Sequence, residues 1–364
     1  MAYTNAVAGL TPQLWDDQFF VDYVRSSRYK RYMGTADTDM FQVKEELTRK
    51  RGDSVTFALV NELTGAGVTG SATLKGNEER LNSRSHKLTV DVLRHAVAVD
   101  DWDEQKSVID LRMAAQSQLR QWASTKLRDA CTNALGQIDG VNYTASTATQ
   151  RNTWTANNVD RVLFGSTIAN YNATFATAIG GLSAGEQCSP LALSLMKRMA
   201  QSASPKIKPI YVKEMDQEWY VVFVNSLSWR DLTEDNPTTN VLTLANRDAR
   251  IRGVDNPLFT GDSLVWDGMI IREIPEIAPL GDVSGSGGAR IAPVYLCGAQ
   301  AVGMAWAQRT KSTTDTTDYE FLHGVGVQEI RRIEKLRFGT AAGADLTTPK
   351  DHGIVTGFFA AAAD

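Results

Sequence analysis

The sequence is poor in the residues that build metal centres and redox sites. Among its 364 residues are 3 cysteines and 4 histidines. No CxxC pair occurs, and no histidines stand at metal-ligand spacing or beside a cysteine. We therefore expect reduced thiols, structural histidines and no metal site. The residues concerned are Cys131, Cys188, Cys297, His86, His95, His323 and His352.

Long apolar runs and an excess of positive charge are also absent. No window of about 18 apolar residues occurs, so we expect no membrane-spanning helix. The start of the chain lacks a basic segment followed by an apolar one, which predicts no signal peptide. The net charge is -4. A chain of this charge has no global attraction for nucleic acid, so any such contact would be local, weak and non-specific.

Catalytic patterns are equally scarce. The chain holds no G-x-S-x-G nucleophile turn. Acid pairs such as Asp100–Asp101 are adjacent in sequence and are better explained as helix caps. A phosphate loop is excluded because Ser71 stands where that motif requires lysine. We therefore predict no catalytic residue, no cofactor-binding residue and no enzyme activity.

One motif nevertheless has the spacing of a cofactor-binding turn. In the stretch 63–76, Gly65, Gly67 and Gly70 follow the pattern G-x-G-x-x-G. Asp91 lies about 20 residues further on, where a ribose-binding acid could sit. A nicotinamide-dependent enzyme that uses these glycines is therefore the alternative from a different functional class.

The residues around this motif favour a structural role for the glycines. A dinucleotide turn needs a buried parallel strand before it and a helix after it. Here Val55, Phe57 and Leu59 alternate with more polar residues, which predicts a half-exposed strand, and no apolar stripe follows the glycines. We interpret the glycines as the bend of an extended hairpin.

The strongest helix signal lies between Asp101 and Gly136. Asp101 is the expected N-cap, apolar residues recur at steps of three and four, and Gly136 ends the pattern. We predict one long helix over about 102–135, a rod of roughly 50 Å. A helix this long is more typical of a structural support than of the wall of a compact binding pocket.

Elsewhere helices and strands are mixed without regular βαβ order, so the predicted class is α+β. Helices are expected near Trp15, Phe19 and Tyr23 and after Ser189. The stretch 137–158 predicts a loop, and 293–308 predicts a buried strand running into a helix. Further strands are expected at 54–59, 86–99, 207–215, 218–227, 256–277, 324–338 and 352–359.

The order of these parts resembles the major capsid proteins of tailed bacteriophages, with the Hong Kong phage type of fold. It is most similar to the family typified by the large podophage N-four. The likeness runs in order from about residue 10 to residue 360. The segments that carry it are 43–79, 93–99 ("LRHAVAV"), 110–122 ("DLRMAAQSQLRQW"), 256–273 and 295–308.

The resemblance implies a tailed-phage capsid fold in five parts. These are an N-terminal arm (1–47), an extended loop (48–85), a peripheral domain (86–183) with its spine helix, an axial domain (184–308) and a C-terminal segment (309–364) that returns to the peripheral domain. The implied intersubunit contacts are Trp15, Phe19 and Tyr23 in the arm and Arg49, Lys50, Arg51, Gly65, Gly67, Gly70 and Lys75 in the loop.

The function implied is structural. The chain would self-assemble as pentamers and hexamers into the icosahedral shell around the double-stranded DNA of a tailed phage, in the bacterial host cytoplasm. Because the sequence starts almost directly at the arm, we expect a separate scaffolding protein, together with a portal and with or without a decoration protein. DNA contact would be weak and non-specific. An encapsulin-like compartment shell is the alternative within the same fold.

Covalent crosslinking is a further possibility that the resemblance raises. Some relatives join a loop lysine to an asparagine on a neighbouring subunit. Lys75 lies in the corresponding loop, but no partner asparagine can be named, so no crosslink is expected.

Overall fold

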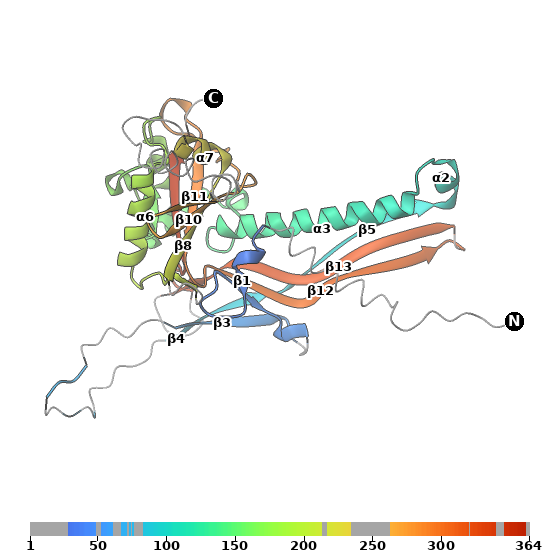
Figure 1. Cartoon of the computed structure of the whole chain (residues 1–364), viewed down its shortest axis with the longest axis horizontal. Helices are drawn as coiled ribbons and strands as arrows, with labels where there is room; N and C mark the ends of the chain where they lie inside the picture. The colour runs from blue at the N-terminus through green and yellow to red at the C-terminus, as the bar shows by residue number, and fades with distance from the viewer. Residues whose placement is uncertain are drawn as a thin grey trace, which may run out of the picture.

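The computed structural model describes residues 28–48, 52–60, 67–70, 73, 75, 83–212, 217–233, 263–319, 321–339 and 346–361. Figure 1 shows a globular body from which a long helix and paired strands extend to one side, with β3 and β4 near the base of this extension. Helices and strands are mixed in both parts, so the predicted α+β class is confirmed. Within the described ranges, no helix combines the length and apolar character that crossing a bilayer requires.

The body is built on a seven-stranded sheet, here called the body sheet, whose order is β6-β16-β11-β8-β10-β9, with β7 pairing to β8. Every residue of β11 and β16 is buried, as expected for central strands covered on both faces. The strands are β6 (Val162–Phe164), β7 (Ile210–Val212), β8 (Gln217–Val224), β9 (Ser263–Trp266), β10 (Met269–Glu273), β11 (Ile291–Cys297) and β16 (Ile354–Ala360).

Short helices cover the body sheet. The side chain of Ser189 caps α6 (Pro190–Ser202) by accepting a hydrogen bond from the backbone of Ala192, as predicted. The buried residues of α6 pack in one core with β8 and β16. A second core lies under α4 (Ala148–Asn157) and α5 (Phe175–Gly180). The remaining helix is α7 (Ser226–Thr233).

The prediction of a loop over 137–158 is wrong for its second half. Thr147 and Gln150 form a capping box that starts α4. The many Thr and Asn residues of this segment disfavour a helix in isolation. Burial of Trp154 in the second core overrides that propensity.

The extension from the body is a five-stranded sheet, here called the ribbon sheet, in the order β1-β2-β12-β13-β5. Its strands are β1 (Met33–Gly34), β2 (Phe41–Lys44), β5 (Asp91–Asp100), β12 (Val302–Thr317) and β13 (Leu322–Lys335). The helix predicted at the end of 293–308 is therefore wrong, because these residues open β12. Short apolar runs do not distinguish a buried strand from a buried helix.

One long helix packs along the ribbon sheet. Buried residues of α3 (Leu111–Leu135) recur mainly at four-residue steps, among them Leu119, Ala123 and Leu127. They lie in one core with residues of β12 and β13. Gly136 is the C-cap of α3, as predicted.

The predicted helix over 102–135 is interrupted. A short helix, α2 (Asp101–Lys106), ends before α3 begins. Asp100 caps α2 in place of Asp101, and Asp110 caps α3 by accepting from the backbone of Met113. A second capping acid thus restarts the helix after the β-branched residues Val108 and Ile109, which disfavour helix.

A separate hairpin consists of β3 (Ser54–Val60) and β4 (Ser83–Thr89), paired antiparallel. Val55, Phe57 and Leu59 are buried, so the predicted alternation is confirmed. These side chains form a small core with Leu336 and Phe338, which anchors the hairpin to the end of the ribbon sheet. The single strand predicted over 86–99 is instead two strands, because β4 ends before β5 enters the other sheet.

A buried charged cluster joins these parts where β13 runs into the short pair β14 (Arg337–Phe338) and β15 (Lys350–Asp351). The Lys335 ammonium lies 2.9 Å from the Asp351 carboxylate, and both side chains are almost fully buried. The indole of Trp154 donates a hydrogen bond of 3.1 Å to the same carboxylate. Because Trp154 belongs to the body and Lys335 to the ribbon sheet, this cluster fixes one part against the other.

The two sheets do not follow the domain boundaries expected from the sequence. The segment 86–183 supplies β5 to the ribbon sheet but β6 to the body sheet. The segment 309–364 supplies β13 to the ribbon sheet but β16 to the body sheet. The chain therefore crosses between the two parts several times, and their assignment as peripheral and axial domains stays a prediction.

We predict that Lys335→Met destabilises the folded subunit strongly. The substitution leaves the Asp351 carboxylate buried without its cation, which costs about 3–5 kcal/mol. Urea unfolding of the unassembled subunit measures the change. The double variant Lys335→Met with Asp351→Leu removes both charges and should recover most of the loss; equal instability of the two variants would contradict this account of the cluster.

We also predict an acid-dependent loss of stability from His86 on β4. Burial, with a smaller effect from the nearby Arg337 charge, lowers the pKa of His86 to about 4. Between about pH 6.5 and pH 4 the unfolded chain binds a proton at this position that the folded chain does not. Above about pH 6.5, His86 therefore does not lower the free energy of unfolding. At about pH 4, its burial in the neutral form lowers that free energy by about 3 kcal/mol.

Urea unfolding of wild type and His86→Gln at several pH values tests this linkage. The difference between the two unfolding free energies should change with pH inside that window and level off outside it. His95→Gln, on the exposed part of β5, serves as the matched histidine control. A difference that stays constant with pH would show that His86 makes no such contribution.

Candidate assembly surfaces

The β3–β4 hairpin carries part of the predicted loop contact. Gly67 and Gly70 lie beyond β3 with φ of +69° and +70°, and no other atom lies close to either position. Glycine is needed here for its backbone freedom and not for close packing. Both glycines and Lys75 are exposed. The remaining predicted contacts lie outside the described residues, namely Arg49, Lys50, Arg51, Gly65, Trp15, Phe19 and Tyr23.

The pairing of β3 bears on the nicotinamide alternative. A dinucleotide-binding turn follows a strand of a parallel sheet. In the described part of the chain, the strand before these glycines pairs antiparallel with β4, in a sheet of its own. This pairing differs from that of a dinucleotide-binding turn, and the interpretation of the glycines as the bend of an extended hairpin stays a prediction.

A second candidate surface lies at the far end of the ribbon sheet, where α2 and the β12–β13 turn meet (Figure 1). The backbone N–H of Asp101 donates to the carbonyl oxygen of Phe321, which joins the two segments. Large apolar side chains are exposed on both of them. We call this set the apolar tip; it consists of Trp102, Val108, Ile109, Met113, Tyr319 and Phe321.

Ion pairs hold the apolar tip in shape. Arg112 of α3 contacts the carboxylates of Asp101 and Glu104, at 2.7 Å and 2.6 Å. His323 of β13 lies 3.0 Å from Asp101. Val108 and Ile109 are therefore presented by a fixed backbone between two capped helices. Sequence reasoning missed this surface, although an apolar pair between two capping acids was the available signal.

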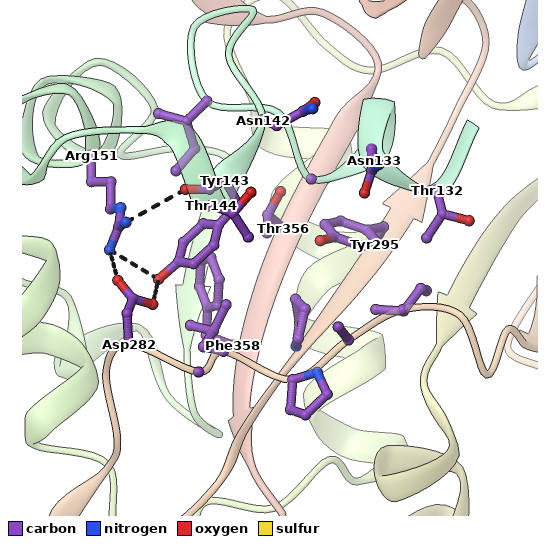
Figure 2. A pocket seen from close by; sticks show the side chains of 18 of the residues that line it. Thr132, Asn133, Asn142, Tyr143, Thr144, Arg151, Asp282, Tyr295, Thr356 and Phe358 are labelled. Atoms are coloured by element: carbon purple, nitrogen blue, oxygen red, sulfur yellow. Dashed lines mark hydrogen bonds and ion pairs between the residues drawn. The ribbon is translucent and has the colours of Figure 1, made fainter. Parts of the chain in front are cut away.

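A cavity of about 350 Å³ lies between the end of α3, the segment 276–282 and the strands β11 and β16. At its rim Tyr143 donates a hydrogen bond of 2.9 Å to Asp282, and Arg151 contacts the same carboxylate (Figure 2). Burial alone would raise the pKa of Asp282, but hydrogen bonds from Arg151 and Tyr143 outweigh it and lower that pKa.

Three titratable groups at this cavity have pKa values shifted away from neutrality. Burial raises the pKa of Tyr143 and of Tyr295, so both phenols stay protonated. The Asp282 carboxylate is held ionised by its ion pair and serves as a structural acceptor. None of these residues is poised near neutral pH as a general acid or base.

The cysteine thiols are also unsuited to nucleophilic chemistry. The three cysteines are free and buried. Burial raises the pKa of Cys131 to about 12 and raises those of Cys188 and Cys297 as well, which leaves them as inert thiols. In the described part of the chain, no group of three or more His, Cys, Asp or Glu side chains could hold a metal ion.

Comparison with known proteins gives these surfaces a context. The model of the family described as phage capsid protein matches residues 4–362. The major capsid protein of Pseudomonas phage KPP25 is 25% identical, over 99% of this chain and 98% of that protein.

Solved structures agree. The capsid asymmetric unit of cyanophage Pam1 is 34% identical, with a TM-score of 0.81 and full coverage of both chains. The capsid of Ralstonia phage GP4 shares the fold at 20% identity, with a TM-score of 0.70 over 92% of this chain and 91% of that one. The tailed-phage capsid fold expected from the resemblance is thereby confirmed. The chain belongs to the phage capsid protein family, a family of structural proteins.

Proposed function

We propose that this chain is the major capsid protein whose copies form the closed icosahedral shell around the double-stranded DNA of a tailed phage. One observation carries the proposal: the projecting elements cannot bury their own apolar surface. The apolar tip exposes six large side chains on two adjoining segments. Contiguous exposed apolar groups on a folded protein mark interaction surfaces.

The two parts of the subunit then have different roles. The body, built on the body sheet, is the axial domain, and the ribbon sheet with α3 is the peripheral domain. The β3–β4 hairpin is the base of the extended loop, which lies over a neighbour and meets it through Gly67, Gly70 and Lys75 together with Arg49, Lys50, Arg51 and Gly65. Trp15, Phe19 and Tyr23 in the N-terminal arm strap a further neighbour.

Assembly requires repeated contacts of moderate strength. Each specific interface of a standard kind buries about 1,600 Å² in total. Heterologous contacts close into rings when the rotation between copies allows it, so one chain can form pentamers and hexamers. β3 and β4 are anchored through the core at Leu336 and Phe338, and a change of the loop's angle about this anchor would serve both rings.

The partners follow from this role. We expect a separate scaffolding protein, a portal, with or without a decoration protein, and packaged DNA held by weak non-specific contact. The net charge of -4 suits a container that does not grip its genome. Assembly takes place in the host cytoplasm and the product is the virion shell. The N-four-like type within the family remains our expectation from the sequence.

Electron microscopy of the protein purified from cells that also express its phage's scaffolding protein tests the function. We expect closed icosahedral particles. Nucleic acid in particles from infected cells supports a genome container, whereas packed enzymes would identify a compartment shell. Single subunits under every assembly condition would contradict the proposal.

Charged substitutions in the apolar tip should block assembly without unfolding the subunit. Ile109→Asp combined with Met113→Glu places two carboxylates in a contact that must be dry. We expect the concentration needed for assembly to rise at least about tenfold, since about 1.4 kcal/mol of lost contact energy suffices. Light scattering follows assembly, and urea unfolding should be unchanged because both side chains are exposed.

The matched control is Val159→Asp, at an exposed valine outside the apolar tip and the hairpin. It should assemble close to wild type. Normal assembly of the tip variant would remove the apolar tip from the set of contacts.

A further inference from the structure

The ribbon sheet ends in a long unpaired edge. β5 is the last strand of this sheet and its one neighbour is β13. The register between them runs without a shift from Asp100 opposite Leu322 to Asp91 opposite Arg331. The other edge of the sheet, β1, has only 2 residues. Among the described residues, the side of β5 that faces away from β13 is therefore a free edge along the whole strand. β12 is also unpaired on its outer side beyond Ala305, but register shifts between Trp306 and Lys311 interrupt that edge.

The hydrogen-bond pattern identifies the backbone groups on that edge. Just past the register, the N–H of Asp101 donates to the carbonyl oxygen of Phe321 at 3.1 Å. In an antiparallel pair, bonded and non-bonded positions alternate. The odd-numbered residues of β5 therefore bond to β13, while the even-numbered ones turn their N–H and C=O groups outward.

One outward group is already occupied. The N–H of Val92 is bound by the carboxylate of Asp91 at 2.8 Å, which agrees with the alternation. Arg94, Ala96 and Ala98 follow along the same edge and are exposed. Within the described residues, no hydrogen bond engages their outward backbone groups. They present three donor–acceptor pairs at every second residue.

The surroundings leave this edge open to another strand. No proline and no bulge interrupts β5. The long helix lies on one face only, where His95 stacks on Trp122 with ring centroids 4.5 Å apart. On the opposite face Ala96 and Ala98 lie opposite Gly326 and Gly324 of β13, so the side chains above this half of the edge are small, whereas Arg94 lies opposite Gln328. Proteins normally protect edges of this kind, because such edges pair readily with other chains.

We propose that a strand of a second copy of this chain adds to the free edge of β5 in the shell. The inference rests on the proposed function, since a shell surrounds each subunit with identical copies. Main-chain hydrogen bonds would supply the contact, with the outward groups of Arg94, Ala96 and Ala98 as its ladder. Such a contact uses main-chain groups and not particular side chains. We expect it to tolerate small changes of the angle between subunits, which a contact present in both pentamers and hexamers requires.

Hydrogen exchange with mass spectrometry, compared between free subunits and assembled shells, tests the proposal. In shells, three more backbone amides of the peptide 91–100 should be protected from exchange than in free subunits. These are the amides of Arg94, Ala96 and Ala98. Failure to form shells would count against the proposed function. Shells in which these amides exchange as in free subunits would overturn this inference alone. Protection already present in free subunits would show that the chain covers its own edge and would equally overturn it.

Proline substitution provides an independent test. Ala96→Pro removes an outward N–H, and proline is tolerated on an edge strand when its missing N–H faces away from the sheet. We expect unchanged unfolding of the subunit and at least a tenfold higher assembly concentration. Val92→Pro is the matched control, because its N–H is already bound by Asp91, and it should assemble like wild type.

A proline substitution at a second position keeps the test valid if the first variant folds poorly. If Ala96→Pro lowers the stability of the free subunit, Ala98→Pro repeats the test one step along the ladder. Assembly at wild-type concentrations by a folded proline variant at either position would overturn the proposal.

Discussion

The packing of one helix on one long strand pair is the interaction on which the rest of this structure depends. A two-stranded ribbon such as β12–β13 is marginally stable by itself. Leu119, Ala123 and Leu127 of α3 give it a dry face, in one core with residues from both strands. The β3–β4 hairpin covers the base of the sheet through its core with Ala305 and Leu336. At the far end, the described residues leave the side chains of the apolar tip exposed.

The buried charges at the junction make this extension useful to an assembly. Lys335 and Asp351 connect the ribbon sheet to Trp154 in the body through short polar contacts. Such groups contribute little net stability compared with apolar packing, but they tolerate few alternative arrangements. A subunit whose parts hold a fixed relative position can place several contacts on its neighbours at once. In the proposed shell, variation between pentamers and hexamers would be left to the hairpin.

Much of the fold could be predicted because its signals are local. Ser189 with Pro190 starts α6, Gly136 ends α3, and the alternation from Val55 to Leu59 marks β3. The secondary-structure predictions were wrong where tertiary contacts determine whether a segment forms a helix or a strand. The opening of β12 is buried almost without interruption and so lacks a strand period, and α4 depends on the burial of Trp154. The free edge of β5 could not be found because it depends on which strands pair, whereas the apolar tip had a local signal, the apolar pair Val108–Ile109 between two capping acids, that was missed.

A cryo-electron microscopy map of the assembled shell, at a resolution that separates strands, tests the central claim most directly. The claim is that copies meet through the elements that project from the body. The account predicts that the β3–β4 hairpin, the apolar tip and the β5 edge all lie against neighbouring subunits. A shell in which these three surfaces face solvent, while the bodies alone make the contacts, would contradict it.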